Sequence, residues 1–141
     1  MKDVCIIGSG ISGATIANNL SKKFSIDVYD KARGAGGRSS NKKFKKNESF
    51  DHGVQYISPK NSHFKKFISD LILKKVLKKW YGRHIFLNKN IIEKKKHIKI
   101  IGKKGNNAIS KYLLKNINCN YNAEVVKILY KNKIWEITFS D

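Results

Sequence analysis

The sequence predicts an α/β protein with a doubly wound, Rossmann-like dinucleotide-binding fold and the start of a β-rich domain. Two observations carry this prediction: a strand, glycine-rich turn and helix at the N-terminus, and a second strand that ends in an acid. The apolar run Val4–Ile7 is typical of a strand buried on both faces of a parallel sheet. It leads into Gly8, Gly10 and Gly13, spaced as in a dinucleotide-binding turn, and then into a helical pattern over residues 12–22.

Each glycine of this turn has a steric task beside a pyrophosphate. Gly8 makes the tight turn, Gly10 lets the backbone approach the phosphates, and Gly13 lets the helix pack closely on the strand. The first helical residues, Ile11 and Ser12, present free N–H groups and the positive end of the helix dipole to negative charge. We therefore predict that residues 8–13 bind the pyrophosphate of a dinucleotide.

The second predicted strand, residues 25–30, ends at Asp30. In dinucleotide-binding folds, an acid about 20 residues beyond the glycines hydrogen-bonds the hydroxyls of the adenosine ribose. Asp30 has that position, so the sequence predicts it as a ribose-binding residue. The alternative is a solvated acid at the end of a strand.

A second glycine-rich loop, residues 34–38, directly follows this acid. A domain that binds a nicotinamide dinucleotide does not need this loop. A domain that binds a longer dinucleotide, with a ribityl chain beyond its pyrophosphate, does need it. Gly36 and Gly37 allow close backbone approach, and Arg38 carries a forked, permanent positive charge suited to phosphate. The loop therefore favours FAD as the cofactor, with Gly37 and Arg38 in its binding site.

The composition bounds the possible partners. The chain has 141 residues, about one domain. Its net charge of +20 would be compatible with binding to nucleic acid. However, its basic residues are nearly all Lys, they are spread over every predicted element, and no nucleic-acid-binding motif accompanies them. We therefore expect solvated lysine-covered faces, a small-molecule substrate and no nucleic-acid partner; the oligomeric state is open.

The cysteines and the apolar segments bear on localisation. Cys5 and Cys119 lie far apart in apolar strand patterns, which predicts buried thiols in a reducing compartment. The apolar run near the N-terminus is broken by glycines too early for a secretion signal, and no run reaches membrane-spanning length. These features predict a cytoplasmic protein without a membrane partner.

Four motifs occur in order: the turn at residues 8–13, Tyr29-Asp30-Lys31, the loop at residues 34–38, and the segment at residues 50–56. Together they resemble the flavin-binding amine-oxidase superfamily, and most closely its renalase-like branch. The resemblance implies that residues 50–56 lie beside the isoalloxazine ring and that the adenine end is bound from two further segments. The cofactor-site residues implied in this way are Lys31, Gly53, Gln55, Tyr56 and Val125.

The same resemblance implies a divided domain organisation. Residues 1–75 are the first segment of the FAD-binding domain, residues 76–101 begin a β-rich substrate domain, and residues 102–141 are an incomplete second segment. Proteins of this family are more than twice as long, so we expect a truncated fold here, with no catalytic residue assignable. Lys75 stands where the branch usually has a glycine, although Lys disfavours positive φ.

Three local predictions complete the description. Residues 41–49 are interpreted as a polar lysine loop, and Asn61 is predicted to cap a helix. A later helix is predicted to be capped by Asn106 or Asn107.

The function predicted is FAD-dependent oxidation of a small reduced molecule, with hydride passing to the flavin and then to oxygen. By resemblance, the substrate is an isomeric dihydronicotinamide dinucleotide or an amine. His52 is interpreted as a structural residue in preference to a general base. No metal-binding spacing occurs in the sequence. The alternatives are a non-catalytic dinucleotide-binding module, an inactive fragment, or a basic nucleic-acid binder.

Overall fold

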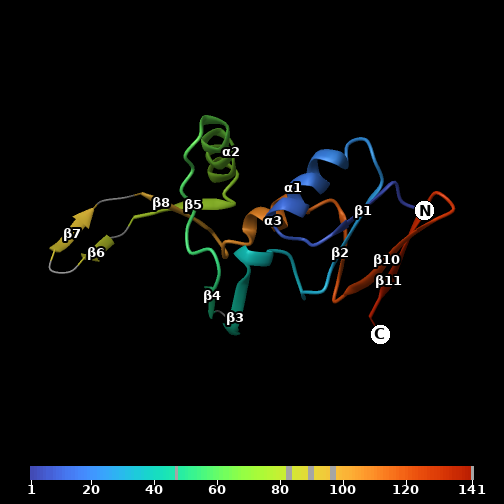
Figure 1. Ribbon diagram of the computed structural model, residues 1–141. Helices are drawn as coiled ribbons and strands as arrows, with labels where there is room; N and C mark the ends of the chain where they lie inside the picture. The colour runs from blue at the N-terminus through green and yellow to red at the C-terminus, as the bar shows by residue number, and fades with distance from the viewer. Residues whose placement is uncertain (47, 82–83, 89–90, 96–97, 141) are drawn as a thin grey trace.

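The computed structural model describes residues 1–46, 48–81, 84–88, 91–95 and 98–140, with side chains outside residues 82–97. Figure 1 shows an elongated molecule with one hairpin at each end. The elements in chain order are β1 (Val4–Ile7), α1 (Ile11–Leu20), β2 (Ile26–Asp30), the 3-10 helix η1 (Gly37–Ser39), β3 (Asn41–Lys45), β4 (Glu48–Asp51), α2 (Ser62–Leu73), β5 (Leu77–Trp80), β6 (His84–Asn88), β7 (Ile91–Lys95), β8 (Lys99–Gly102), α3 (Ala108–Leu113), β9 (Asn118–Tyr121), β10 (Val125–Lys131) and β11 (Ile134–Phe139).

A three-stranded parallel sheet supports the N-terminal turn. Its strand order is β1-β2-β9, with Ile6 opposite Val28 and Val28 opposite Cys119. Helix α1 connects β1 to β2 and packs on α3, where Asn18 Nδ2 donates to Leu113 O at 2.9 Å. The parallel pairing with a helical crossover confirms the predicted Rossmann-like α/β fold.

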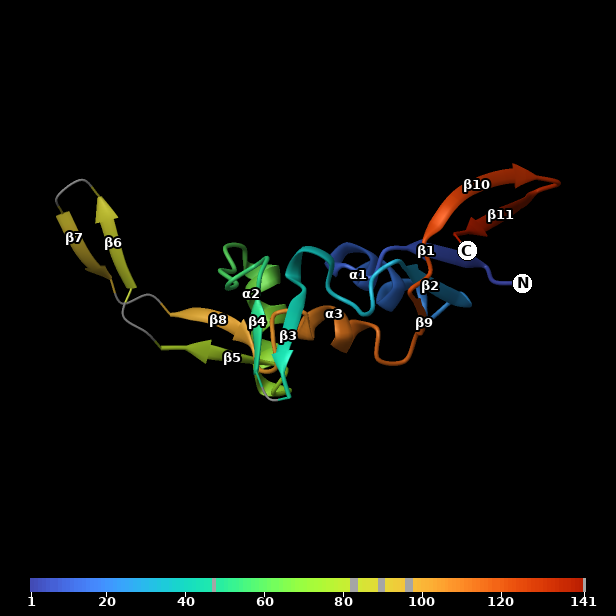
Figure 2. The same ribbon diagram turned by 90° about the horizontal axis from the view of Figure 1, so that it is seen from below.

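The apolar core is continuous from this sheet to α2 and β5. Its buried side chains come from α1, β2, α2, β5 and α3; they include Ala14, Ala17, Val28, Ile68, Leu71, Leu77 and Leu113. The two alanines of α1 allow the helix to approach its neighbours closely because they have the smallest side chains that a regular helix accommodates well. Figure 2 shows the β6–β7 hairpin extending away from this core, at the opposite end of the molecule from the β10–β11 hairpin.

The burial of β1 differs from the prediction. Val4 and Ile6 are half-buried, but Cys5 and Ile7 are exposed, with Ile7 at 51%. The prediction of two covered faces was therefore wrong, because only one face of β1 is packed against the core. Cys119 is half-buried, so the prediction of two buried thiols was also wrong.

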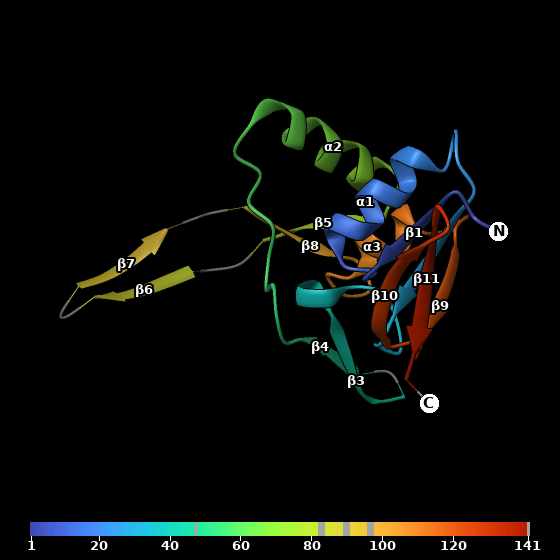
Figure 3. The same cartoon turned by 45° about the vertical axis from the view of Figure 1, so that its right-hand side comes forward.

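Strands β3 and β4 pair in antiparallel orientation, with Asn41 opposite Asp51, where a polar loop was predicted. Its strands contain Lys, Asn and Glu in place of alternating apolar residues, so the periodic signal of a half-buried strand is missing. Farther along the chain, β6 pairs with β7, β10 with β11 and β5 with β8, each in antiparallel orientation. Figure 3 shows the β10–β11 hairpin beside the three-stranded sheet.

Helix α2 begins and ends with well-defined caps. The Asn61 side chain accepts a hydrogen bond from Phe64 N at 2.7 Å, which confirms the predicted cap. At the other end, Lys75 N donates to Ile72 O and Val76 N donates to Leu71 O, both at 2.9 Å. These two bonds define a Schellman motif whose left-handed residue is Lys75, with φ +58°. Lys75 thus adopts the conformation that usually requires glycine.

We expect Lys75→Gly to stabilise the chain. Left-handed φ costs an L-residue about 1–2 kcal/mol, and the greater flexibility of glycine in the unfolded chain offsets part of the gain, leaving about 0.5–1 kcal/mol. Urea unfolding measures the change. Lys75→Ala is the matched control, because it removes the ammonium group and keeps the Cβ; equal stabilisation by both variants would contradict a backbone origin.

No helix within the described ranges is both long enough and apolar enough to cross a membrane.

Candidate dinucleotide site

The turn between β1 and α1 is held by its glycines. Gly8 has φ +103°, and its N–H donates to Tyr29 O at 2.7 Å. Gly13 lies so close to this turn that an added Cβ would be 2.0 Å from Gly8 O. Ile11 and Ser12 are exposed at the start of α1, where the first N–H groups of the helix are free to meet an anion. The predicted site residues of this turn are therefore together at one helix N-terminus.

Asp30 reaches across from β2 into the same turn. Its Oδ2 accepts hydrogen bonds from Ser9 N, at 2.7 Å, and from Ser9 Oγ, while its Oδ1 accepts from Ala32 N at 2.8 Å. Ser9 is fully buried, and this carboxylate accepts hydrogen bonds from both its backbone N–H and its hydroxyl. Asp30 is thus not a free solvated acid: it joins the end of β2 to the glycine-rich turn. Sequence reasoning missed Ser9, whose small polar side chain between two glycines was the available signal.

The pKa of Asp30 reflects these bonds. Partial burial raises the pKa of Asp30. The hydrogen bonds from Ser9 and Ala32 and the nearby Lys31 charge lower it by more, so the pKa lies below the usual value of 3.8. The carboxylate is therefore charged at neutral pH. A charged acceptor in this place suits the hydroxyl donors of a ribose.

The second glycine-rich loop packs directly on the first turn. Gly36 N donates to Ser9 O at 3.2 Å, and Gly10 and Gly36 form a parallel bridge. Gly37 has φ +52°, and an added Cβ there would lie 3.2 Å from Gly10 Cα. The two loops together form one backbone cradle, and an added Cβ would be too close to its neighbours at Gly13, Gly36 and Gly37. The Arg38 side chain is exposed beside it.

The segment after β4 continues this surface. Val54 N donates to Arg38 O at 3.0 Å, and an added Cβ on Gly53 would lie 2.0 Å from the same oxygen. Gly53 is therefore next to the second loop. Gln55 and Tyr56 are exposed farther along, and the Tyr56 ring lies 3.7 Å from Lys99 Nζ.

A buried asparagine that was not predicted as a site residue fixes this segment. Asn106 is 2% exposed; its Nδ2 donates to Val54 O at 2.7 Å and its Oδ1 accepts from Gly102 N at 2.8 Å. Its backbone N–H donates to Asp51 Oδ1 at 2.8 Å. Asn107 occupies the first position before α3, but its side chain caps nothing. The prediction that either asparagine caps α3 was wrong, because both side chains bond to other segments.

We expect Asn106→Ala to destabilise the chain by about 1–2 kcal/mol, because it leaves the buried Gly102 N–H and the partly buried Val54 carbonyl without partners. The loosened segment at residues 53–56 should also exchange its amide hydrogens faster. Chemical unfolding and hydrogen exchange measure the two effects. Asn116→Ala, at an exposed asparagine, is the matched control. Equal stability of both variants would show that Asn106 does not hold the segment.

The end of β2 and the start of β10 are close. Ala123 N donates to Asp30 O at 3.0 Å, Lys31 Nζ lies 3.4 Å from Glu124 Oε1, and Val125 is half-buried at the next position. The structure thus places Lys31 and Val125 near Asp30, with the Lys31 ammonium paired to an acid.

Two titratable groups near the loops have structural partners. His52 Nε2 lies 3.1 Å from Ser40 Oγ, in agreement with its interpretation as a structural residue. Burial, with a smaller contribution from Cys119, raises the pKa of Tyr121 to about 12, so this phenol stays neutral beside Asp30. The part of the chain that the structure describes holds no group of three His, Cys, Asp or Glu side chains placed to bind a metal.

Residues 6–71 match the sequence profile of the NAD(P)-binding Rossmann-like domain family. This segment is a Rossmann-like domain. Over 77 residues the chain is 38% identical to prenylcysteine oxidase 1 of Bos taurus. The aligned region is 52% of this chain and 15% of that protein. The segment is thus similar both to a domain family and to part of a longer oxidase.

Solved structures share the fold at low sequence identity. Tetracycline destructase Tet(51) has a TM-score of 0.59 and 18% identity, with 96% of this chain and 33% of that chain covered. A flavoprotein/dehydrogenase from Cytophaga hutchinsonii has a TM-score of 0.53 and 14% identity, with 99% and 35% covered. The chain thus spans about a third of the length of these proteins.

Proposed function

We propose that the Rossmann-like domain binds FAD and belongs to an FAD-dependent oxidoreductase. The contact of the two glycine-rich loops, where Gly37 approaches Gly10 and Gly36 bonds to Ser9, is the observation that carries this proposal. It makes a cradle longer than a pyrophosphate turn alone, and the segment at Gly53 extends it. The similarity to an oxidase and the fold shared with a flavoprotein support FAD as well.

The described residues fit the parts of FAD. The free N–H groups at Ile11 and Ser12 face the position of the pyrophosphate, and the exposed Arg38 adds a charge there. The Asp30 carboxylate would accept hydrogen bonds from the ribose hydroxyls in addition to those from Ser9. Lys31 and Val125 lie on the adenine side, and Gln55 and Tyr56 on the side of the isoalloxazine ring.

The reaction proposed is oxidation of a small reduced molecule, either an isomeric dihydronicotinamide dinucleotide or an amine, in a renalase-like protein. Bound FAD supplies the hydride acceptor, which oxygen then regenerates. Residues 8–13 and 34–38 hold and orient the cofactor, and no proton transfer is assigned to this chain. Residues 1–75 and 102–141 are proposed as two segments of the FAD-binding domain, with residues 76–101 beginning a substrate domain. We further propose a cytoplasmic location, consistent with free thiols on Cys5 and Cys119.

A second candidate is a dinucleotide-binding module without turnover. It is favoured by the exposure of Gln55 and Tyr56, because within the described residues the ring end of the site lacks the cover that excludes water from a reacting flavin. FAD binding without substrate-dependent reduction of the flavin would support this candidate.

Titration of the folded chain with FAD and with NAD, each followed by calorimetry, tests the cofactor. We expect FAD to bind at least about tenfold more tightly, because the second loop adds contacts beyond the shared pyrophosphate and ribose. Arg38→Gln should weaken FAD by about tenfold through loss of a charged contact, whereas Arg33→Gln, which removes an equally exposed charge, should not. Tighter binding of NAD than of FAD would contradict the proposal.

A further inference from the structure

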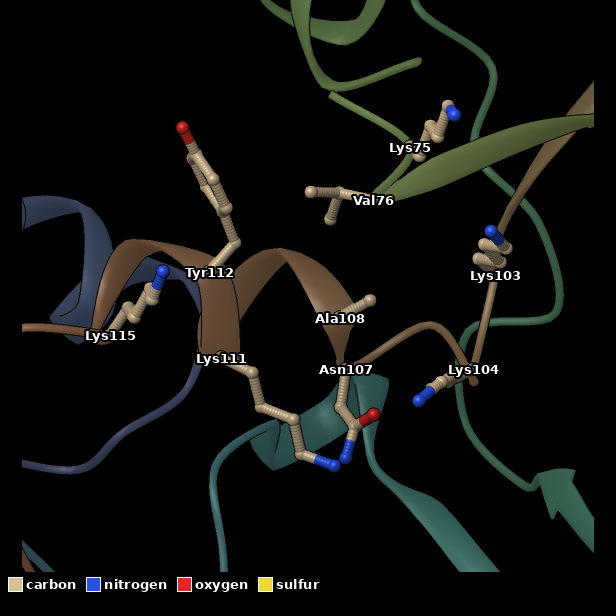
Figure 4. Close-up of a pocket in the computed structure, with 9 residues that line it drawn as sticks. All are labelled: Lys75, Val76, Lys103, Lys104, Asn107, Ala108, Lys111, Tyr112 and Lys115. Atoms are coloured by element: carbon tan, nitrogen blue, oxygen red, sulfur yellow. The ribbon is translucent and has the colours of Figure 1, made fainter. Parts of the chain in front are cut away.

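A pocket of about 390 Å³ opens between the end of α2, the loop after β8 and one face of α3 (Figure 4). This volume lies in the range of small-molecule sites. The lining of the pocket includes none of the predicted cofactor residues, and Asn107 joins it to the second glycine-rich loop through a hydrogen bond to Ala35 O. Its lining residues are Lys75, Val76, Lys103, Lys104, Asn107, Ala108, Lys111, Tyr112 and Lys115.

The lining is far more basic than the chain. Lys and Arg make up 30 of the 141 residues, whereas five of the nine lining residues are Lys and none is acidic. Within the part of the chain that the structure describes, none of these five ammonium groups has a carboxylate within ion-pair distance. Their mutual repulsion has no internal counter-charge, so a bound anion would relieve it.

Lys75 provides a second, independent observation. It sits at the left-handed position that ends α2, where glycine would be free of strain. A strained backbone position that keeps a long charged side chain points to a use for that side chain. Here the side chain is on the rim of the pocket.

Asn107 provides the third. It is 6% exposed, its Nδ2 donates to Ala35 O at 3.2 Å, and its Oδ1 is buried without a hydrogen-bond partner. Figure 4 shows its amide between the side chains of Lys104 and Lys111, two other lining residues of the pocket. A buried acceptor without a partner costs free energy, so it favours a ligand that donates a hydrogen bond.

We propose that this pocket binds a phosphorylated small molecule of the nucleotide class. The phosphates would lie among the lysines, and a hydroxyl or amino group would donate to Asn107 Oδ1. The flat base would lie along the apolar side formed by Val76, Ala108 and Tyr112. This site shares no lining residue with the cradle, although Asn107 borders both because its Nδ2 donates to Ala35 O in the second loop.

Calorimetric titration of the 141-residue chain with ATP, in the presence of saturating FAD, tests the proposal. We expect Lys104→Gln/Lys111→Gln to weaken ATP binding at least tenfold. Lys22→Gln/Lys23→Gln removes the same charge from exposed lysines after α1 and should change it less than twofold. All four lysines are exposed, so the variants should fold, which circular dichroism checks.

Three results would overturn the proposal. Equal losses in both double variants would mean non-specific attraction to the +20 chain. ATP binding that disappears in saturating FAD would mean that ATP occupies the cradle. Inorganic triphosphate that binds as tightly as ATP would show that the base makes no contact. We expect Tyr112→Leu to lower ATP affinity severalfold; unchanged affinity in this variant would show the same. The first and third outcomes are also measurable without FAD, so a failure of the FAD proposal leaves them unaffected.

Discussion

Gly13→Ala is expected to lower FAD affinity at least tenfold and to destabilise the chain. The added Cβ would lie 2.0 Å from Gly8 O, so α1 has to move away from the turn that it follows. Overpacking of this kind costs about 1–3 kcal/mol, and the shift also moves the helix N–H groups away from the pyrophosphate. Calorimetric titration with FAD and urea unfolding measure the two effects.

Gly34→Ala is the matched control for this variant. Gly34 lies in the second loop, but an added Cβ there meets nothing within 4 Å. FAD affinity and stability should therefore stay close to those of the unchanged chain. If Gly13→Ala bound FAD as tightly as Gly34→Ala, close packing of helix and turn would not be what forms the site.

Asp30→Ala is expected to lower FAD affinity by at least about tenfold, because it removes a charge-assisted hydrogen bond worth about 1.5–3 kcal/mol. It should also destabilise the free chain, since the fully buried Ser9 loses its acceptor. Asp27→Ala, which removes an acid from the same strand away from the turn, is the control for charge. Unchanged FAD affinity in Asp30→Ala would show that the acid serves only the turn.

The stability effect of Asp30 should depend on pH. Its pKa is lower in the folded chain than the usual 3.8, so its contribution is complete above that value and is lost as pH falls through the folded pKa. The stability gap between the unchanged chain and Asp30→Ala should thus be constant from about pH 7 to pH 5 and shrink below about pH 4. Asp3, whose pKa is lowered by hydrogen bonds from Ser25, is common to both proteins and cancels in the difference.

The elements that could be predicted are those with local signals. Val4–Ile7 followed by the glycine spacing determined a strand, a turn and a helix, and the alternating residues before Asp30 indicated the second parallel strand. Fold class follows from this unit because a parallel pair requires a helical crossover. The position of Asp30 at the strand end then placed it beside the turn.

The features that could not be predicted depend on contacts between distant segments. The β3–β4 hairpin pairs lysine-rich strands, and the burial of Asn106 comes from Gly102, Asp51 and Val54. A cap and a bridge between segments use the same asparagine chemistry, so the sequence pattern at residues 106–107 fits both. The exposure of Cys5 likewise depends on which face of β1 is covered, and an apolar run does not reveal that.

Amide chemical-shift mapping of the isotope-labelled chain, titrated with FAD, tests the central claim most directly. The claim is that the two glycine-rich loops form a single cradle for the dinucleotide. The account predicts that the largest shifts occur at residues 8–13 and 34–38, with smaller ones at residues 30–31 and 53–56. Largest shifts at residues 103–115, or shifts confined to the first loop, would contradict it.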